Sequence, residues 1–306
     1  MNIFITGGRG FLGSALYDRL VREGHSVVAP SSTDANLTNM DSLEKYGHIK
    51  YDRIYHLAAW TQAGDFCLHH AGEQWILNQK INSNVLDWWK VSQSEAKLIC
   101  MGTSCAYAPN STLKEDDYLE GSPIDSLFTY AMTKRMLYVG LRALESQFGL
   151  SYLCLVPSTL YGPGYHTDGR QMHFIFDLIR KIMRGKFLGE SVVLWGDGNQ
   201  RRELVYVNDF IETTLELSDN CSNELINIGA GEEFSIKEFA RIICKYMDYD
   251  FDQIKFDETK YVGAKSKCLD TTKLKSKLPN LQLMDLDHGI KKTIDWFMAN
   301  KDRFLN

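Results

Sequence analysis

The stretch "TGGRGFLG", residues 6–13, follows the short apolar run "NIFI" and precedes a segment with helical periodicity. Glycines with this spacing stand where a strand turns tightly into a helix, and they let a pyrophosphate approach the backbone closely. The N-terminus of the helix then offers free N–H groups and a partial positive charge to the phosphates. The sequence therefore predicts a dinucleotide-binding loop made by Gly7, Gly10 and Gly13, with Phe11 and Leu12 at the start of the helix.

The alternation of strand and helix continues through the N-terminal half. Apolar strand-like runs cover 2–6, 26–29, 53–59, 97–102 and 151–157, and amphipathic helical segments cover 10–25, 73–93 and 130–149. Strands that alternate with helices predict an α/β fold with a doubly wound parallel sheet, covered on both faces.

After Pro157 the pattern becomes irregular, and Gly162, Pro163 and Gly164 indicate a loop. The shorter elements of the C-terminal third predict a smaller lobe over the carboxyl edge of the sheet. We expect a nucleotide-binding domain over 1–162 plus about 201–230, and a substrate-binding lobe over about 163–200 plus 231–306.

Composition excludes several classes of protein. The 306 residues carry a formal net charge of −5, which argues against a nucleic-acid or anionic-membrane surface. No apolar run is long enough to span a bilayer. The seven cysteines are an odd number and include no CxxC pair, so we expect neither a disulfide framework nor a zinc or other metal site. Such cysteine usage predicts a reducing, cytoplasmic location.

The choice of cofactor is normally read at the end of the second strand, where an acidic residue binds the ribose 2′-hydroxyl of NAD. Here residues 27–34 read "VVAPSSTD", and no carboxylate precedes Asp34. Arg9 lies within the glycine loop, where it could face a 2′-phosphate, although a solvated loop arginine explains it equally well. We expect NADP(H), with contacts from Arg9, Ser31 and Ser32.

A candidate acid/base pair lies in "TYAMTK", residues 129–134. Tyr130 and Lys134 are four residues apart in a predicted helix, so both side chains point the same way. A lysine beside a phenol should lower the tyrosine pKa towards working pH. A YxxxK spacing is common by chance, but it becomes specific beside a glycine loop and the hydroxyl-rich strand end "GTSCAY", residues 102–107.

Together these motifs resemble the extended short-chain dehydrogenase/reductase family, in its nucleotide-sugar-modifying branch. The resemblance rests on TGxxGFLG, "HLAA" (56–59), "GTSCAY", Tyr130-xxx-Lys134, "PSTLYGP" (157–163) and "RELVYVNDF" (202–210). Within that branch the chain is most similar to the GDP-L-fucose synthases, the GDP-4-keto-6-deoxymannose epimerase–reductases. This similarity adds "SCAYAP", a histidine before a helix, "VVLWGDGNQRRELVYV", "INIGAGEEFSIKEFA" and "WFMANKDRF".

The resemblance implies a Rossmann fold and a set of catalytic roles. Thr103 would hydrogen-bond the sugar carbonyl, and Tyr130 would protonate the C4 oxygen as hydride arrives. Lys134 would bind the nicotinamide ribose and tune Tyr130. Cys105 and His173 would be the acid/base pair for epimerisation at C3 and C5, since a thiol and an imidazole both transfer protons near neutrality.

The resemblance also implies ligand contacts and a partner. Arg202 and Lys267 match basic positions near the substrate and its phosphates. The remaining implied contacts are Ala58 to the cofactor and Ser104, Thr159, Lys181 and Trp195 to the substrate. Helices near 75–93 and 130–149 would form a homodimer, as is typical of the family.

The expected function is NADPH-dependent 4-reduction of a GDP-linked 4-keto-6-deoxy sugar, with epimerisation at C3 and C5. A dehydratase is disfavoured, because the Asp–Glu pair of resembling dehydratases is replaced here by Ser104–Cys105. A catalytically silent NADP-binding regulator should have lost Tyr130 or Lys134, and both are present.

Several positions depart from the GDP-L-fucose synthases and keep another alternative open. The loop after "HLAA" reads "WTQAGD", and Thr159 stands where the family has asparagine. Trp60, Tyr165 and Phe176 are expected to reshape the substrate pocket. A C4-reductase without epimerase activity, acting on a different GDP-sugar such as a 6-deoxy-heptose, would fit these changes.

Overall fold

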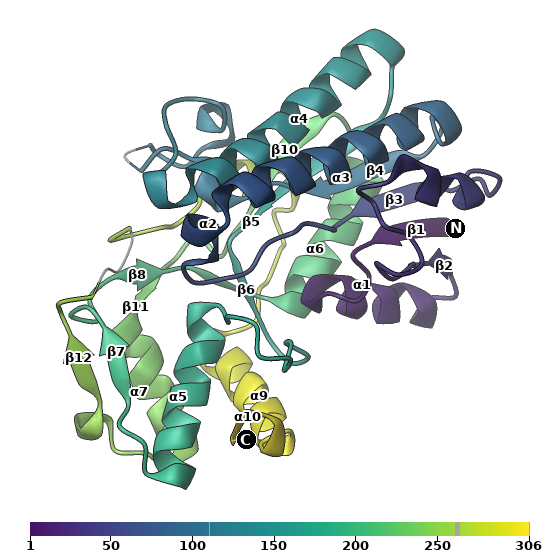
Figure 1. Cartoon of the computed structure of the whole chain (residues 1–306). Coiled ribbons are helices and arrows are strands. Elements are labelled where there is room, and N and C mark those ends of the chain that lie inside the picture. The colour runs from purple at the N-terminus through teal and green to yellow at the C-terminus, as the bar shows by residue number, and fades with distance from the viewer. Residues whose placement is uncertain (110, 261–263, 306) are drawn as a thin grey trace.

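Six parallel strands form the central sheet of the protein, seen in a computed structural model that describes residues 1–109, 111–260 and 264–305 (Figure 1). The strand order is β10-β5-β4-β3-β1-β2. The strands are β1 (Asn2–Thr6), β2 (Ser26–Val28), β3 (Arg53–His56), β4 (Lys97–Met101), β5 (Tyr152–Pro157) and β10 (Glu224–Ile228), and each neighbouring pair is parallel. The order reverses beside β1, which places the usual ligand crevice of such sheets at its carboxyl end. The predicted doubly wound parallel sheet is confirmed.

Helices cover both faces of the sheet. In Figure 1, α3 (Ala71–Ser92) and α4 (Phe128–Phe148) lie on one face, and α1 (Phe11–Arg22) and α6 (Val207–Asn220) lie on the other. Alternate residues of β4 serve the two cores: Leu98 and Cys100 pack with α3 and α4, while Ile99 and Met101 pack with α1 and α6. Burial on both faces explains why the strands read as continuous apolar runs.

Two strands differ from the prediction. β3 ends at His56 rather than at residue 59, because the backbone N–H groups of Leu57 and Ala58 turn to the Thr6 hydroxyl, each at 3.2 Å. The edge strand β10 was not predicted. It pairs with β5 along five residues of "ELINI", a run with two polar members that alone does not indicate a strand.

A smaller lobe, at the lower left of Figure 1, has its own apolar core. This lobe is built from α5 (Phe174–Leu188), α7 (Ile236–Met247), α9 (Leu286–Ala299) and α10 (Asp302–Leu305), with β7 (Val193–Trp195) paired to β12 (Lys255–Asp257). Phe11, directly after the glycine loop, meets the rings of Tyr165 and Phe176 at centroid distances of 5.3 and 5.6 Å. The lobe therefore lies over the carboxyl end of β1, and the boundaries expected for the two domains stay a prediction.

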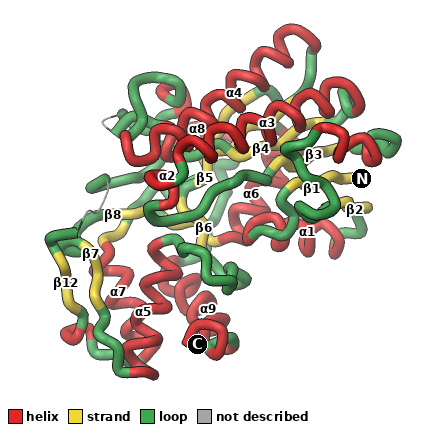
Figure 2. Tube along the Cα trace, viewed as in Figure 1, coloured by secondary structure: helices red, strands yellow, loops and turns green. Residues whose placement is uncertain are grey.

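Shorter elements complete the fold (Figure 2). These are β6 (Thr159–Tyr161) paired with β9 (Leu204–Tyr206), β8 (Arg201–Arg202) paired with β11 (Phe234–Ser235), the helices α2 (Phe66–His69) and α8 (Thr272–Lys277), and 3₁₀ turns at Met40–Tyr46, Ser104–Ala106, Glu115–Asp117, Asp125–Leu127 and Phe251–Gln253. Within the described residues, no helix has the length and apolar character needed to cross a membrane.

Candidate active site

The glycine loop is held by close backbone packing. Gly7 has φ +71°, and a Cβ there would lie 2.8 Å from the Ala58 nitrogen. A Cβ on Gly13 would lie 2.2 Å from the Gly7 carbonyl oxygen, so α1 packs directly against the loop. At Gly10 the nearest atom to such a Cβ is that same oxygen, at 3.3 Å. Gly7 and Gly13 thus shape the loop, and Gly10 leaves its outer face open for a ligand.

A neutral polar relay supports the loop from below. The Thr6 hydroxyl accepts the N–H groups of Leu57 and Ala58, so its own proton goes to His56 Nδ1, at 2.8 Å. His56 Nε2 then carries the proton and donates it to Asn82 Oδ1 at 3.1 Å, a tautomer assigned from this pattern. Burial lowers the pKa of His56 to about 4, so the imidazole is uncharged at neutral pH.

The loop after β2 places charges of both signs beside the glycine loop. The Ser31 hydroxyl and backbone N–H donate to Asp34 Oδ2 at 2.5 and 3.1 Å. These hydrogen bonds, with the charges of Lys45 and Arg9, lower the pKa of Asp34. Arg9 and Ser32 are exposed. Asp34 therefore lies within the electrostatic range of Arg9.

Thr103 joins the end of β4 to α4. The chain passes Gly102, where a Cβ would meet the Tyr118 hydroxyl at 2.7 Å, and then enters the 3₁₀ turn Ser104–Ala106. Thr103 Oγ1 accepts the Cys105 N–H at 3.2 Å, and its hydroxyl also hydrogen-bonds to Tyr130. The structure thus brings the strand-end threonine close enough to the helix tyrosine to lower its pKa.

Tyr130 is a protonated phenol at neutral pH. Burial raises its pKa, Cys105 and Cys67 raise it further, and the hydrogen bond with Thr103 opposes them. The expectation that Lys134 would lower this pKa is wrong. The Lys134 ammonium instead donates to the Met101 carbonyl at 2.9 Å. Burial is the largest effect on both groups: it lowers the pKa of Lys134 and raises the pKa of the Tyr130 phenol. A phenol in this state suits proton donation.

Cys105 receives a hydrogen bond from a distant segment. Lys267 Nζ donates to Cys105 Sγ at 3.0 Å, although the two residues are 162 positions apart. Burial raises the pKa of the Cys105 thiol, but the charge and hydrogen bond of Lys267, the hydrogen bond of Thr103 and the charge of Arg202 outweigh it. The net pKa is below that of an ordinary thiol, which favours the thiolate.

His173 precedes α5 and lies near the same lysine. Its backbone N–H donates to the Tyr165 hydroxyl at 3.2 Å, and the residue is partly exposed. The surrounding protein desolvates the ring, and with the charges of Lys267 and His166 it lowers the pKa of His173 to about 4. Lys267 therefore favours a thiolate at Cys105 and a neutral imidazole at His173.

The other predicted substrate residues lie at several places around the lobe. Arg202 donates to the Ala264 carbonyl at 2.8 Å, and its charge reaches Cys105. Trp195 is 53% exposed at the end of β7, and Thr159 opens β6. Ser104 begins the 3₁₀ turn, and Lys181 pairs with Asp177 at 3.0 Å on α5.

Two of the expected pocket residues, Tyr165 and Phe176, are buried in the core of the lobe. Phe176 is 0% exposed and stacks on Tyr165 at a centroid distance of 3.7 Å. The expectation that Phe176 would reshape the pocket is therefore wrong, because α5 turns that side chain into the lobe. Trp60 is half-buried and packs against Phe66 at 4.8 Å.

Two buried charged residues, Arg135 and Glu203, were not among the predicted site residues. Arg135 donates to the Ala106 carbonyl at 3.0 and 2.6 Å and to the Gly121 carbonyl at 2.7 Å, so it holds the turn that carries Cys105 against α4. Glu203 is buried between β8 and β9. The only signal for Glu203 was one carboxylate at the start of the apolar run "LVYV", and nothing local marked Arg135.

Comparison with known proteins points to one family. The sequence model of the NAD dependent epimerase/dehydratase family matches residues 3–229. The chain is 29% identical over 310 residues to a GDP-L-fucose synthase of Dictyostelium discoideum, a match that covers 97% of this chain and 95% of the relative.

Solved structures share the whole fold. A GDP-L-fucose synthetase from Naegleria fowleri bound to NADP superposes with a TM-score of 0.88 at 23% identity, covering 100% of this chain and 96% of that one. A GDP-6-OMe-4-keto-L-xylo-heptose reductase from C. jejuni superposes with a TM-score of 0.89 at 21% identity, covering 98% of each chain. At these identities the likeness establishes the fold.

Proposed function

The chain belongs to the NAD dependent epimerase/dehydratase family, and on this premise we propose that it is an NADPH-dependent 4-reductase of a GDP-linked 4-keto-6-deoxy sugar, with epimerisation at C3 and C5. The observation that carries the proposal is the protonated Tyr130 phenol, hydrogen-bonded to Thr103, beside a thiol whose pKa Lys267 lowers. The GDP-sugar names of the relatives support the substrate class.

The residues at the carboxyl end of β1 fit NADP(H). The open outer face at Gly10 and the N-terminus of α1 suit the pyrophosphate, since free N–H groups and the helix dipole favour anions there. Arg9 and Ser32, both exposed after β1 and β2, would meet the 2′-phosphate with Ser31, and Lys134 would meet the nicotinamide ribose. When bound, NADPH supplies hydride to C4 of the sugar.

Reduction uses the Thr103–Tyr130 pair. The Thr103 hydroxyl holds the C4 carbonyl oxygen, and Tyr130 gives that oxygen its phenolic proton as C4 gains hydride. The ketone becomes an alcohol, and Tyr130 is left as a phenolate that regains a proton from solvent. A silent NADP-binding regulator would not need Thr103 and Tyr130, so the presence of both residues argues against that alternative.

Epimerisation uses Cys105 and His173. A C4 ketone acidifies the C–H bonds at C3 and C5, so the Cys105 thiolate can remove a proton from one face and a protonated His173 can return one to the other. With a pKa of about 4, His173 is almost entirely neutral at pH 7, so few molecules carry the proton that this step requires. This observation favours the second candidate, a C4-reductase of another GDP-sugar without epimerase activity.

Deuterium incorporation separates the two candidates. The enzyme is incubated with GDP-4-keto-6-deoxymannose and NADPH in deuterated water, and the product is analysed by NMR. We expect NADPH consumption with deuterium at C3 and C5, and loss of that deuterium in Cys105→Ser. Consumption without deuterium would leave a reductase alone, and no turnover would reject this sugar.

We also propose a homodimer in the cytoplasm, held through α3 and α4. Both helices carry exposed apolar side chains, including Trp75 (40%), Ile76 (53%), Met136 (42%) and Val139 (40%). All seven cysteines are free thiols, in keeping with a reducing compartment. Sedimentation at micromolar concentration should show a dimer that the double change Met136→Glu and Val139→Glu dissociates; a wild-type monomer would contradict the interface.

A further inference from the structure

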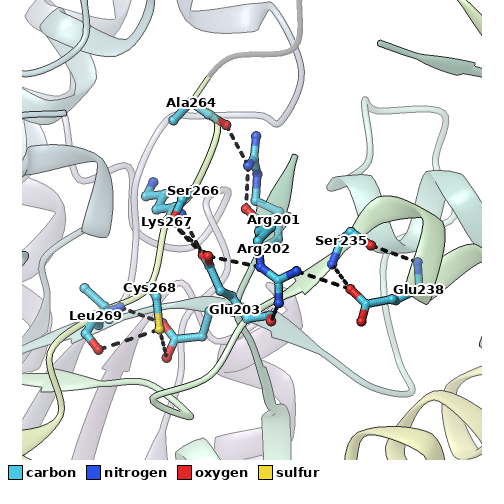
Figure 3. A network of polar contacts seen from close by, with 11 residues as sticks. Arg201, Arg202, Glu203, Ser235, Glu238, Ala264, Ser266, Lys267, Cys268 and Leu269 are labelled. Atoms are coloured by element: carbon cyan, nitrogen blue, oxygen red, sulfur yellow. Dashed lines mark hydrogen bonds and ion pairs between the residues drawn. The ribbon is translucent and has the colours of Figure 1, made fainter. Parts of the chain in front are cut away.

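Residues 264–269 reach the site without regular secondary structure, and side chains from the lobe hold them (Figure 3). At one end, the Arg201 backbone N–H donates to the Lys265 carbonyl at 2.8 Å, and Arg202 donates to the Ala264 carbonyl at 2.8 Å. In the middle, the Ser266 hydroxyl donates to Glu233 at 2.9 Å. One backbone hydrogen bond and several side-chain contacts, rather than a strand ladder, therefore hold this segment.

Glu203 holds the other end of the segment. Its Oε2 accepts the Leu269 N–H at 3.1 Å, and its Oε1 accepts the Gly231 N–H at 2.7 Å and faces Cys268 Sγ at 3.7 Å. The side chain is 2% exposed. Figure 3 shows the segment passing Arg202 and Glu203. When a buried carboxylate joins two backbone segments, its removal breaks the contacts with both and leaves their N–H groups without an acceptor.

Lys267 lies between the two carboxylates. Its backbone N–H donates to Glu233 at 3.1 Å, and the next two residues, Cys268 and Leu269, contact Glu203. From this fixed backbone the Lys267 side chain extends to Cys105 Sγ at 3.0 Å. A hydrogen bond between charged groups at this distance weakens steeply when one end moves.

We propose that Glu203 is a positioning residue, whose carboxylate holds Cys268–Leu269 so that the Lys267 ammonium meets the Cys105 sulfur. This proposal rests on the proposed function only where it gives the Cys105 thiolate a role in epimerisation. Besides Lys267, the groups that act electrostatically on Cys105 include Thr103 and Arg202, which favour the thiolate, and its charge in turn acts on Tyr130 and Cys67.

The test follows the alkylation of Cys105 by iodoacetamide as a function of pH, by mass spectrometry of the Cys105 peptide. The wild-type midpoint should lie below that of an ordinary thiol, about 8.5. Lys267→Met should raise it by about one pH unit or more, since an adjacent opposite charge has an effect of that size. Glu203→Gln should also raise the midpoint of Cys105 alkylation, although the variant keeps Lys267.

A control is Asp209→Asn. It removes a carboxylate that is less buried than Glu203 and that also accepts a backbone N–H, that of Met284 at 2.5 Å. It should leave the Cys105 midpoint unchanged. A wild-type midpoint in Glu203→Gln, with Lys267→Met shifted and circular dichroism intact, would overturn the positioning role. If Glu203→Gln does not fold, Glu203→Asp, which keeps the charge and shortens the reach, must show the rise instead.

The alkylation needs no substrate, so failure of the proposed function is a separate result. An enzyme that leaves GDP-4-keto-6-deoxymannose unchanged but shows the expected midpoints keeps Glu203 as a positioning residue and loses the substrate assignment. An enzyme that turns the sugar over, with equal midpoints in wild type and Glu203→Gln, keeps the function and loses the positioning role.

Discussion

The glycine loop and the 264–269 segment both bring functional groups to the carboxyl edge of the sheet, but different forces hold them. In the loop, neighbouring residues pack backbone on backbone, with the Gly10 N–H on the Gly7 carbonyl at 3.0 Å. In the segment, carboxylates 34 and 66 positions away hold Lys267 and Leu269.

The difference teaches which part of the site tolerates change. A loop set by steric fit fails when a single methyl group is added, because backbone atoms cannot give way. A segment held by carboxylates is instead expected to shift when one of them is protonated or removed. The four predictions below test this contrast, from the largest expected effect to the smallest.

The glycine loop should fail on one added methyl group. Gly13→Ala places a Cβ 2.2 Å from the Gly7 carbonyl oxygen, so we expect a loss of about 3 kcal/mol or more of unfolding free energy, and no NADPH binding. Gly10→Ala, with its nearest atom at 3.3 Å, should keep the fold and lose only cofactor affinity. Urea unfolding and NADPH fluorescence titration measure both; equal stability of the two variants would break the steric account.

Tyr130 lies near Cys105, the residue that Lys267 of the 264–269 segment contacts. Tyr130→Phe removes the proposed proton donor, so hydride transfer should fall by about 100-fold or more while NADPH affinity is retained. The control is Tyr107→Phe, which removes a phenol that donates to Asn227 at 2.6 Å and should cost only stability, about 1 kcal/mol. A single-turnover rate near wild type in Tyr130→Phe would contradict the assigned role.

The two regions should depend on pH in opposite directions. His56, under the glycine loop, has a folded pKa of about 4 against an ordinary 6.5, so the unfolded chain binds more protons and stability falls as pH drops from 6.5 to 4. Burial raises the pKa of Glu203, at the segment, to about 7 from an ordinary 4.5, so stability falls as pH rises from 4.5 to 7.

Urea unfolding across this range, in wild type, His56→Gln and Glu203→Gln, measures both effects. His56→Gln should remove the loss of unfolding free energy between pH 6.5 and 4, which is up to about 3 kcal/mol. Glu203→Gln should remove the loss between pH 4.5 and 7, which is of about the same size. If both substitutions changed the pH dependence of the unfolding free energy in the same direction, the contrast between the two regions would be contradicted.

The smallest effect is expected at the edge of the glycine loop. Arg9 is exposed, so Arg9→Ala should raise the KM for NADPH by about tenfold, the value of one modest ionic contact, and leave the KM for NADH unchanged. Arg9→Lys keeps the charge, so its KM for NADPH should lie between the values of the wild type and Arg9→Ala. Equal changes for both cofactors would indicate that Arg9 does not meet the 2′-phosphate.

Much of the fold and part of the site were readable because they depend on neighbours in the sequence. The apolar runs predicted β1, β4 and β5 within a residue of their ends, and the helical spacing placed Tyr130 and Lys134 on one helix. β10 was missed, since its five residues form a strand only by pairing with β5.

The sequence by itself determined the glycine loop and the parallel sheet, because backbone sterics and apolar periodicity act over a few residues. The roles of the acid/base groups are predictions that come from the family resemblance. Only the tertiary structure decided that Lys134 binds the Met101 carbonyl rather than tuning Tyr130, that Phe176 belongs to the core, and that Lys267 meets Cys105. Burial and charge set the pKa values of this site, and both arise from segments that meet only in the folded chain.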